Sequence, residues 1–499
     1  MYKPRTKEEL KTLTDDENIN LGDIDTSLIN DMSSLFKESA RKKFNGIENW
    51  DTSNVLDMHD MFFNCRKFNN NVSKWDVSKV ENMACMFFGA EEFNQYIGDW
   101  NVSNVKDMNS IFWGCKKFNQ DLNNWNVSNV ENMSFMFYGA VSFDQPLNNW
   151  NVGNVKNMYG MFNGCKVFNQ DLNNWNVSSV ENMSCMFFEA KNFNQPLNNW
   201  NVSNVNKMYS MFGGCKKFNQ NLNDWNVSNV TDINSMFKCA ESFNQPLNNW
   251  NTYNAENMRS MFEEAFNFNQ DINNWNVSKV KDMSGMFCKC KTFNQALNNW
   301  DTSNVTNMRC MFFEAENFNQ DINKWNVKNI ENMLSMFENA YSFNQPLDNW
   351  DTSNVLYMNR MFFNAKKFNQ SLNNWNVCNV KNMGSMFSGC ESFNQSIGDW
   401  KINKTCVIDN IFENAISLKN VKSILNIYFL ARGNHKKRLL SMLEECDINE
   451  VYTESIKYTK LKDFIKKLEN VYYDELKELI DKKEYIIKEY KQKNKKYKI

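Results

Sequence analysis

Histidine and proline are scarce in this sequence. The 499 residues include only 2 His and 5 Pro, against 40 Phe, 29 Met and 16 Trp. The two histidines, His59 and His435, lie near opposite ends of the chain. A metal site made of several histidines is therefore not expected, and a histidine-activated nucleophile would depend on a single imidazole.

A leader segment and a long apolar run are also missing. The opening residues MYKPRTKEELKTL are polar, which is not the pattern of a signal peptide. The longest apolar run near the end, residues 424–431, is too short to span a bilayer. We therefore expect a cytoplasmic or host-intracellular location and no membrane span.

The abundant aromatic residues follow a strict period. Fifteen of the sixteen Trp fall at every 25th position from Trp50 to Trp400, and only Trp113 lies off this grid. Phe repeats with the same spacing from Phe68 to Phe393. A fixed period of this length indicates a solenoid, here of about 15 turns, in which the Trp side chains form the core. We predict an N-terminal segment at 1–23, the solenoid at 24–418 and a helical tail at 419–499.

Within one unit the pattern changes from strand to helix. Trp150 and Val152 share one face of a short predicted strand. From Val155 to Cys165, apolar residues recur at helical spacing, and Asn154 is in a position to cap the helix that they predict. The fold class is therefore α/β, a leucine-rich-repeat-like solenoid with one strand and one short helix per turn.

The repeat resembles a known family. The motif W-[DN]-[VT]-S-N-V-x-[DN]-M-x-x-M-F, as in residues 300–312, is similar to repeats of BspA-like leucine-rich-repeat surface proteins, including mycoplasma and Listeria surface lipoproteins. The resemblance covers about residues 24–418. It implies a leucine-rich-repeat-like fold, a role in adhesion or protein binding, and a surface location, with no catalytic residues to transfer.

Motifs for catalysis and for metal binding are absent. The sequence has no Gly-rich phosphate loop, H-E-x-x-H or G-x-S-x-G, and no insertion breaks the array between Trp50 and Trp400. The 14 Cys mostly replace Ala, Ser or Gly of other units, which favours free structural thiols. Cys288 and Cys290 form a C-x-C without a second pair. We predict no enzyme, cofactor or metal.

The exposed face of the predicted strand is the candidate binding site. A regular polar ridge there would suit a long protein partner, while the alternative is a ladder of side chains that bonds neighbouring turns. The ridge contains Asn101, Ser103, Asn126, Ser128, Asn151, Asn176, Ser178, Asn201, Ser203, Asn226 and Ser228.

The end of the chain differs from the array. Residues 401–499 carry a net charge of +7, against −9 for residues 1–400. We predict a helix over 419–445 that covers the open end of the solenoid, and a long amphipathic helix over 456–492. The tail either packs as a cap or serves as a basic docking or oligomerisation segment, with no specific nucleic-acid site.

Two functions follow from these features. The first is a non-catalytic repeat scaffold that binds another protein along its strand face or helical edge. The alternative is a structural or surface-adhesion protein that uses the regular Asn and Ser ridge directly.

Overall fold

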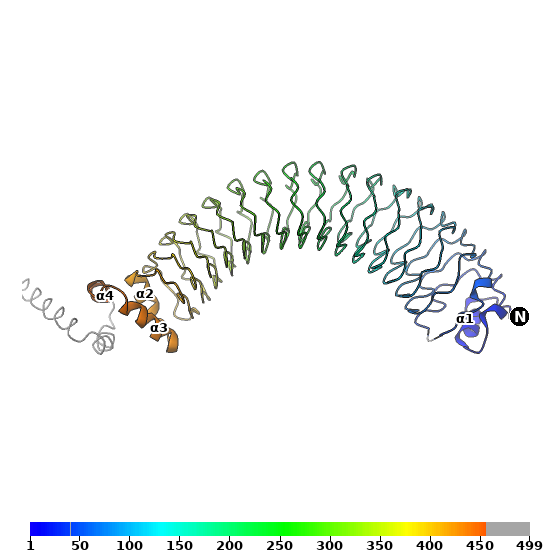
Figure 1. The fold of residues 1–499 in the computed structure, drawn as a ribbon, viewed down its shortest axis with the longest axis horizontal. Helices are drawn as coiled ribbons and strands as arrows, with labels where there is room; N and C mark the ends of the chain where they lie inside the picture. Colours follow the sequence, from blue (N-terminus) through cyan, green and yellow to red (C-terminus); the bar gives the residue numbers. More distant parts are fainter. Residues whose placement is uncertain (40, 456–499) are drawn as a thin grey trace, which may run out of the picture.

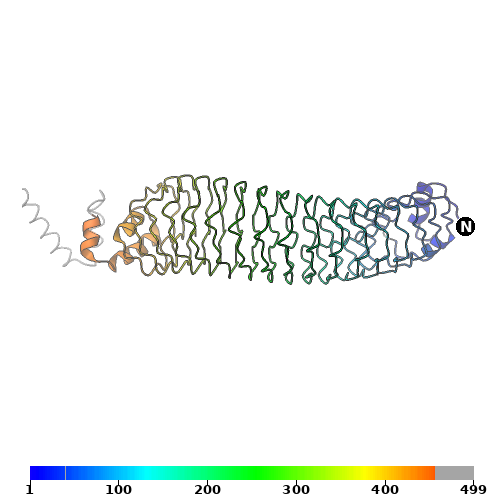
Figure 2. The ribbon, with the colours of Figure 1, turned by 90° about the horizontal axis from the view of Figure 1, so that it is seen from above.

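The chain forms one continuous arch of stacked turns with helices at both ends (Figure 1). The computed structural model describes residues 1–39 and 41–455. Seen from above, the turns lie side by side in a single row (Figure 2). The helical elements are α1 (Lys7–Asp15), η1 (Leu21–Asp23), η2 (Ile47–Asn49), α2 (Val421–Tyr428), α3 (Gly433–Glu444) and α4 (Ile448–Ser455).

A ladder of isolated parallel bridges joins neighbouring turns. Fifteen such bridges link consecutive turns, from Asp31–Asp57 to Asn382–Val407. Bridged partners are 25 residues apart, except for the first pair, which is 26 apart. The predicted repeat solenoid is therefore present, and it has sixteen turns.

The predicted strand at Trp150–Val152 is wrong. The bridge of this turn lies at Asn157 instead. The chain bends directly after Trp150, because the Oδ1 atom of Asn151 accepts the N–H of Gly153 at 3.2 Å. A tight turn follows, in which the N–H of Val155 donates to the carbonyl of Val152 at 3.0 Å. Two consecutive turns leave no room for an extended segment.

The predicted short helix at 155–165 is also wrong, although its apolar stripe is buried. The segment consists of overlapping tight turns, and Gly160 and Gly164 have φ values of +61° and +74°. A right-handed helix cannot continue through left-handed residues. Asn154 therefore caps no helix, and its Nδ2 atom donates to the carbonyl of Ser128 in the preceding turn at 2.7 Å.

These tight turns orient the backbone so that most backbone hydrogen bonds between neighbouring turns run from an N–H group of one turn to a carbonyl of the following turn. Counting the grid Trp as position 0, the N–H groups at positions 8, 10, 12 and 14 donate to carbonyl oxygens of the following turn. In one interface, the N–H of Phe162 reaches the carbonyl of Met186 at 2.8 Å, and the N–H of Gly164 reaches that of Phe188 at 2.7 Å. Positions 10 and 14 are the left-handed residues of each turn.

The core is a set of aromatic columns that run the length of the arch. Phe162, at position 12, stacks on Phe187 of the next turn at 5.7 Å and on Phe168 of its own turn at 4.2 Å. The Met residues at positions 8 and 11 are also fully buried. The prediction that the regular Trp, Met and Phe residues form the core is confirmed.

Each grid Trp is held by one hydrogen bond to the preceding turn. The Nε1 atom of Trp175 donates to the carbonyl of Leu147 at 2.9 Å, and that of Trp200 donates to the carbonyl of Leu172 at 2.9 Å. All fifteen grid Trp make this bond, at 2.8–3.1 Å, and all are 2–5% exposed. A second ladder at position 19 runs through Asn side chains, as where Asn94 Oδ1 accepts the N–H of Asn119 at 2.9 Å.

Helices close both ends of the arch. At the first end, α1 buries Leu10, and Arg41 donates to the carbonyls of Thr14 and Asp16 at 2.9 and 3.0 Å. At the last end, α2 buries Val421, Ile424 and Leu425. The Nδ2 atom of Asn426 donates to the carbonyl of Ile397 at 3.3 Å. In a further turn, the indole N–H of the grid Trp would bond this carbonyl.

The predicted single helix over 419–445 is wrong in its extent. The segment forms two helices, α2 and α3, separated by residues 429–432. The break precedes Gly433, whose φ of +54° is left-handed and is incompatible with a continuous right-handed helix. The long helix predicted over 456–492 lies outside the described residues.

Removing one rung of the Trp ladder tests its contribution to stability. Trp200→Phe deletes the indole N–H, one of two donors to the carbonyl of Leu172, which also accepts the N–H of Trp175 at 3.0 Å. We expect the free energy of unfolding to fall by about 1–3 kcal/mol. Trp113→Phe, at the half-buried Trp outside the ladder, should change it far less. Urea denaturation followed by far-UV circular dichroism measures both, and equal effects would contradict the account.

Candidate functional site

The predicted Asn and Ser ridge is exposed or half-buried, and its side chains serve their own turns. Asn101 Oδ1 accepts the N–H of Ser103 at 3.2 Å, and Asn126 Oδ1 accepts that of Ser128 at 3.2 Å. The bond to the neighbouring turn comes from the next residue, because Asn129 Nδ2 donates to the carbonyl of Ser103 at 2.7 Å. The ridge as a partner-binding site stays a prediction.

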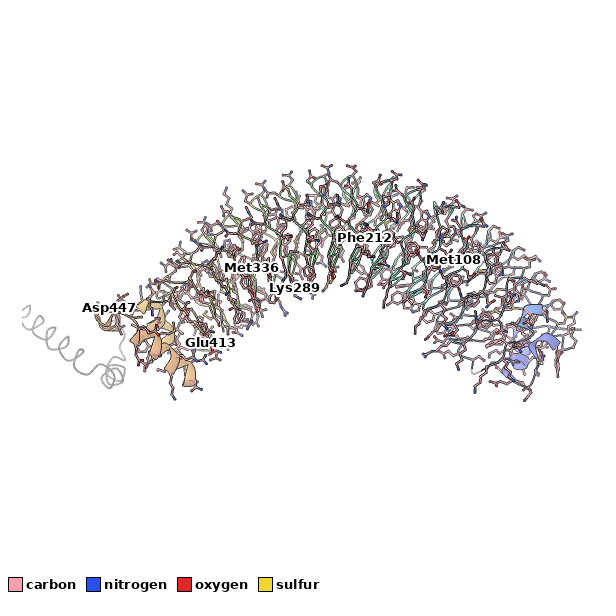
Figure 3. All side chains as sticks on the ribbon, in the orientation of Figure 1. Met108, Phe212, Lys289, Met336, Glu413 and Asp447 are labelled. Atoms are coloured by element: carbon pink, nitrogen blue, oxygen red, sulfur yellow. The ribbon has the colours of Figure 1, made fainter. Side chains whose placement is uncertain are left out.

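A second exposed surface lines the concave side of the arch. Lys289 and Glu413, at positions 14 and 13 of their turns, lie along its inner edge (Figure 3). The side chains at these two positions therefore form columns on the concave face. Unlike the core residues, the residues at positions 13 and 14 differ from turn to turn, so this face is not set by the repeat.

In the N-terminal half, the concave columns carry a row of stacked aromatic rings. Phe63 stacks on Phe88 with ring centroids 4.3 Å apart, Phe88 on Trp113 at 5.2 Å, and Trp113 on Tyr138 at 3.8 Å. All four side chains are half-buried. We call the following residues the aromatic strip: Phe63, Phe88, Trp113, Phe135, Tyr138 and Tyr159.

Phe135 and Tyr159 broaden this strip sideways. Phe135 packs edge to face with Trp113 and with Tyr159, with ring centroids 4.9 and 4.5 Å apart. Beside the strip, position 14 is glycine in four successive turns, from Gly89 to Gly164. All four glycines are left-handed and expose bare backbone next to the rings.

Ring stacking limits which ligands the strip can accept. Each inner ring has its faces covered by its neighbours, so only ring edges are open to solvent. A sugar ring stacks on an open aromatic face, whereas aliphatic and aromatic side chains pack against ring edges. The strip is therefore shaped for apolar protein side chains.

The same columns carry ion pairs in the C-terminal half, where Phe313 and Phe363 also occupy position 13. Lys238 pairs with Glu263 at 3.0 Å, and Lys289 pairs with Glu264 at 2.5 Å. The guanidinium of Arg360 pairs with the nearly buried Glu338, through its Nε atom at 2.9 Å. The side-chain hydrogen bond from Lys289 lowers the pKa of Glu264. The concave face thus has an apolar half and an ion-paired half.

Sequence reasoning missed the aromatic strip. It placed the binding site on the Asn and Ser ridge and did not compare positions 13 and 14 between turns. The available signal was Trp113, the one Trp outside the 25-residue grid. Comparing position 13 across turns would have shown Phe63, Phe88, Trp113 and Tyr138 in succession.

The cysteines at position 15 of their turns are buried and bonded to the backbone. Cys115 Sγ donates to the carbonyl of Phe87 at 3.0 Å, and Cys390 Sγ donates to that of Phe362 at 2.7 Å. Burial raises the pKa of both thiols and raises that of Cys65 to about 12. In the part of the chain that the structure describes, no group of three or more His, Cys, Asp or Glu could hold a metal ion.

Thiol labelling tests this arrangement. Because the thiolate is the reactive form, Cys115, Cys165 and Cys390 should resist iodoacetamide in the native protein. Cys378 is exposed and should react first. Mass spectrometry of tryptic peptides identifies the labelled sites, with urea-unfolded protein as the control. Labelling of Cys115 as fast as Cys378 in native buffer would contradict the burial.

Comparison with solved structures finds distant likenesses. A leucine-rich repeat protein from Bacteroides ovatus is 13% identical, with a TM-score of 0.31 over 61% of this chain and 79% of that one. A leucine rich cell surface protein from Faecalibacterium prausnitzii is 10% identical, with a TM-score of 0.30 over 64% and 76%. No curated protein matches the sequence. Within the described residues, no helix is both long and apolar enough to cross a lipid bilayer.

One protein family matches the array repeatedly. Its description is "Mycoplasma protein of unknown function, DUF285", and it matches residues 8–124, 109–223, 188–287, 264–355 and 345–428. These overlapping matches span the solenoid and α2, and they confirm the resemblance to mycoplasma repeat proteins. The chain therefore belongs to the DUF285 family of mycoplasma proteins of unknown function.

Proposed function

We propose that the protein is a non-catalytic repeat scaffold that binds a protein partner on its concave face through the aromatic strip. The observation that carries this proposal is the run of half-buried rings from Phe63 to Tyr138 at a position that the fold leaves free to vary. The other turns show that the solenoid does not need aromatic residues there, because Lys238 and Glu263 occupy the same position.

The chemistry of the strip suits a protein interface. Trp and Tyr are among the residues that most often dominate the binding energy of protein complexes, and they tend to cluster on the surface. Contiguous exposed apolar area is uncommon on monomeric proteins and marks binding sites. The ion-paired half beside it would then supply a polar rim, with Lys289 and Arg360 already neutralised by Glu264 and Glu338.

The curvature of the arch supports the same choice. Residues on a concave surface converge on a bound object, whereas those on a convex surface diverge from it. A partner seated in the arch could contact several turns at once. The location of this protein in the cell, expected from the sequence to be cytoplasmic or host-intracellular, stays a prediction.

Matched variants of one column test the proposal. Phe88→Ser, Trp113→Ser and Tyr138→Ser together remove three of the four stacked rings of the strip. Phe313→Ser and Phe363→Ser remove half-buried aromatic rings from the same column in the other half of the arch. After in-cell crosslinking of tagged protein, we expect wild type and the control variant to recover the same partner. The strip variant should recover at least about tenfold less, because each anchor ring contributes about 2 kcal/mol.

Circular dichroism of the purified variants shows whether both keep the wild-type fold. Undiminished recovery of the partner by a folded strip variant would contradict the proposal. Equal loss in the strip variant and the control variant would also contradict it, because binding would then not be local to the strip. Failure of the wild-type chain to recover any specific protein would count against the scaffold function itself.

A further inference from the structure

The last turn of the solenoid ends in a row of backbone donors. In each earlier interface, these N–H groups meet carbonyl oxygens of the next turn, as Phe387 meets Ile411 at 2.9 Å. No further turn follows the one that ends near residue 418. In this row, the N–H groups of Ile408, Asn410, Phe412 and Asn414 have no acceptor among the described residues.

The Trp and Asn ladders are completed at this end, but the row of backbone N–H groups is not. Asn426 of α2 takes the place of the next Trp, and the N–H of Lys419 completes the Asn ladder on Asn394 Oδ1 at 2.8 Å. The row of N–H groups instead faces α3. Because all of these peptide groups point along the chain direction, their aligned dipoles place partial positive charge at this end.

A cavity of about 310 Å³ lies between this row and α3. Glu413, on its wall, lies beside α3 in Figure 3. Phe412, Leu439 and Met442 supply an apolar lining, and Asn410, Asn414, His435 and Arg438 supply the polar one. The volume is at the lower end of the range for small-molecule sites.

His435 is an unexplained polar group in this cavity. Its side chain is on α3 and is 9% exposed, and its Nδ1 atom has no hydrogen-bond partner among the described residues. Burial lowers the pKa of His435, against the opposite influence of Asp409 and Glu413. A buried polar atom without a partner costs free energy, so a neutral imidazole left this way indicates a ligand or solvent that completes it.

The cavity has more donors than acceptors. Arg438 Nη1 bonds Asn410 Oδ1 at 3.4 Å and also the carboxylate of Glu413, which neutralises that acid. The backbone N–H groups at Asn410, Phe412 and Asn414 remain as donors, together with the guanidinium and the imidazole. A carboxylate accepts hydrogen bonds only and offers about four lone-pair sites, so it matches this surplus.

We propose that this cavity binds a carboxylate carried on a small apolar body. The carboxylate oxygens would take the place of the carbonyl oxygens that a further turn would supply, and the apolar body would lie on Phe412, Leu439 and Met442. A free acyl amino acid and the last residue of a peptide share this chemistry. The site is separate from the aromatic strip, which lies in the other half of the arch.

Titration calorimetry of the full chain with N-acetyl-leucine tests the site. We expect saturable binding, at least about tenfold weaker binding of N-acetyl-leucinamide, and about tenfold weaker binding by Arg438→Gln, since a lost charge-assisted bond changes affinity on this scale. Lys437→Gln removes an exposed charge from the same helix outside the cavity and should bind as wild type does.

His435→Phe separates binding from folding. It removes the unpaired Nδ1 atom, so the melting temperature should hold or rise, while binding of N-acetyl-leucine should weaken at least about tenfold. The peptide acetyl-Gly-Ser-Gly-Leu with a free carboxylate distinguishes the source. If the peptide binds as tightly as N-acetyl-leucine, the natural ligand is a peptide terminus. If the peptide does not bind, the natural ligand is a small free acid.

Three results would overturn the proposal. The first is no binding of N-acetyl-leucine at millimolar concentration, as expected if the cavity holds only water. The second is equal affinity of the amide, and the third is unchanged affinity in both Arg438→Gln and His435→Phe.

Discussion

Each grid tryptophan carries one N–H group that must be paired when the indole is buried, and the structure pairs it with a carbonyl of the preceding turn. Trp200 reaches Leu172 in this way, 28 residues earlier. The partner is in reach only if the turn keeps its length, because one added residue would shift every later contact. This bond explains why no insertion or deletion interrupts the array between Trp50 and Trp400. It also explains why the Trp period is stricter than that of any exposed residue.

The bonds between turns have a direction, and this makes the two ends of the arch different. N–H groups at positions 8, 10, 12 and 14 point toward the C-terminal end, so the first turn ends in acceptors and the last in donors. Side chains of α1, such as Lys7 near Asp31, face the first end. At the last end Asn426 of α2 completes the Trp ladder and Lys419 completes the Asn ladder, while the donor row faces the cavity beneath α3. Both proposed sites therefore lie where the repeat ends or is free to vary.

The sequence predicts burial in this protein better than it predicts conformation. The apolar residues from Trp150 to Cys165 are buried as expected, because a strict period places equivalent residues in one column whatever the local backbone does. The strand was wrong because Asn151 turns the chain directly after Trp150. The helix was wrong because left-handed residues such as Phe135 and Cys185 have no local preference for that conformation. They adopt it because bonds to neighbouring turns select it. The aromatic strip is invisible in one unit, since its stacked rings at position 13 are 25 residues apart and meet only once the turns stack.

Hydrogen exchange at the indole N–H groups tests the Trp ladder most directly. In protein labelled with ¹⁵N at its tryptophans, the fifteen ladder N–H groups should exchange slowly with D₂O, through opening of the turns. The N–H of Trp113, which lies outside the ladder and is half-buried, should exchange fastest. Slow exchange of the fifteen ladder resonances beside one fast resonance is the predicted result. Fast exchange of many indole N–H groups in folded protein would contradict the account.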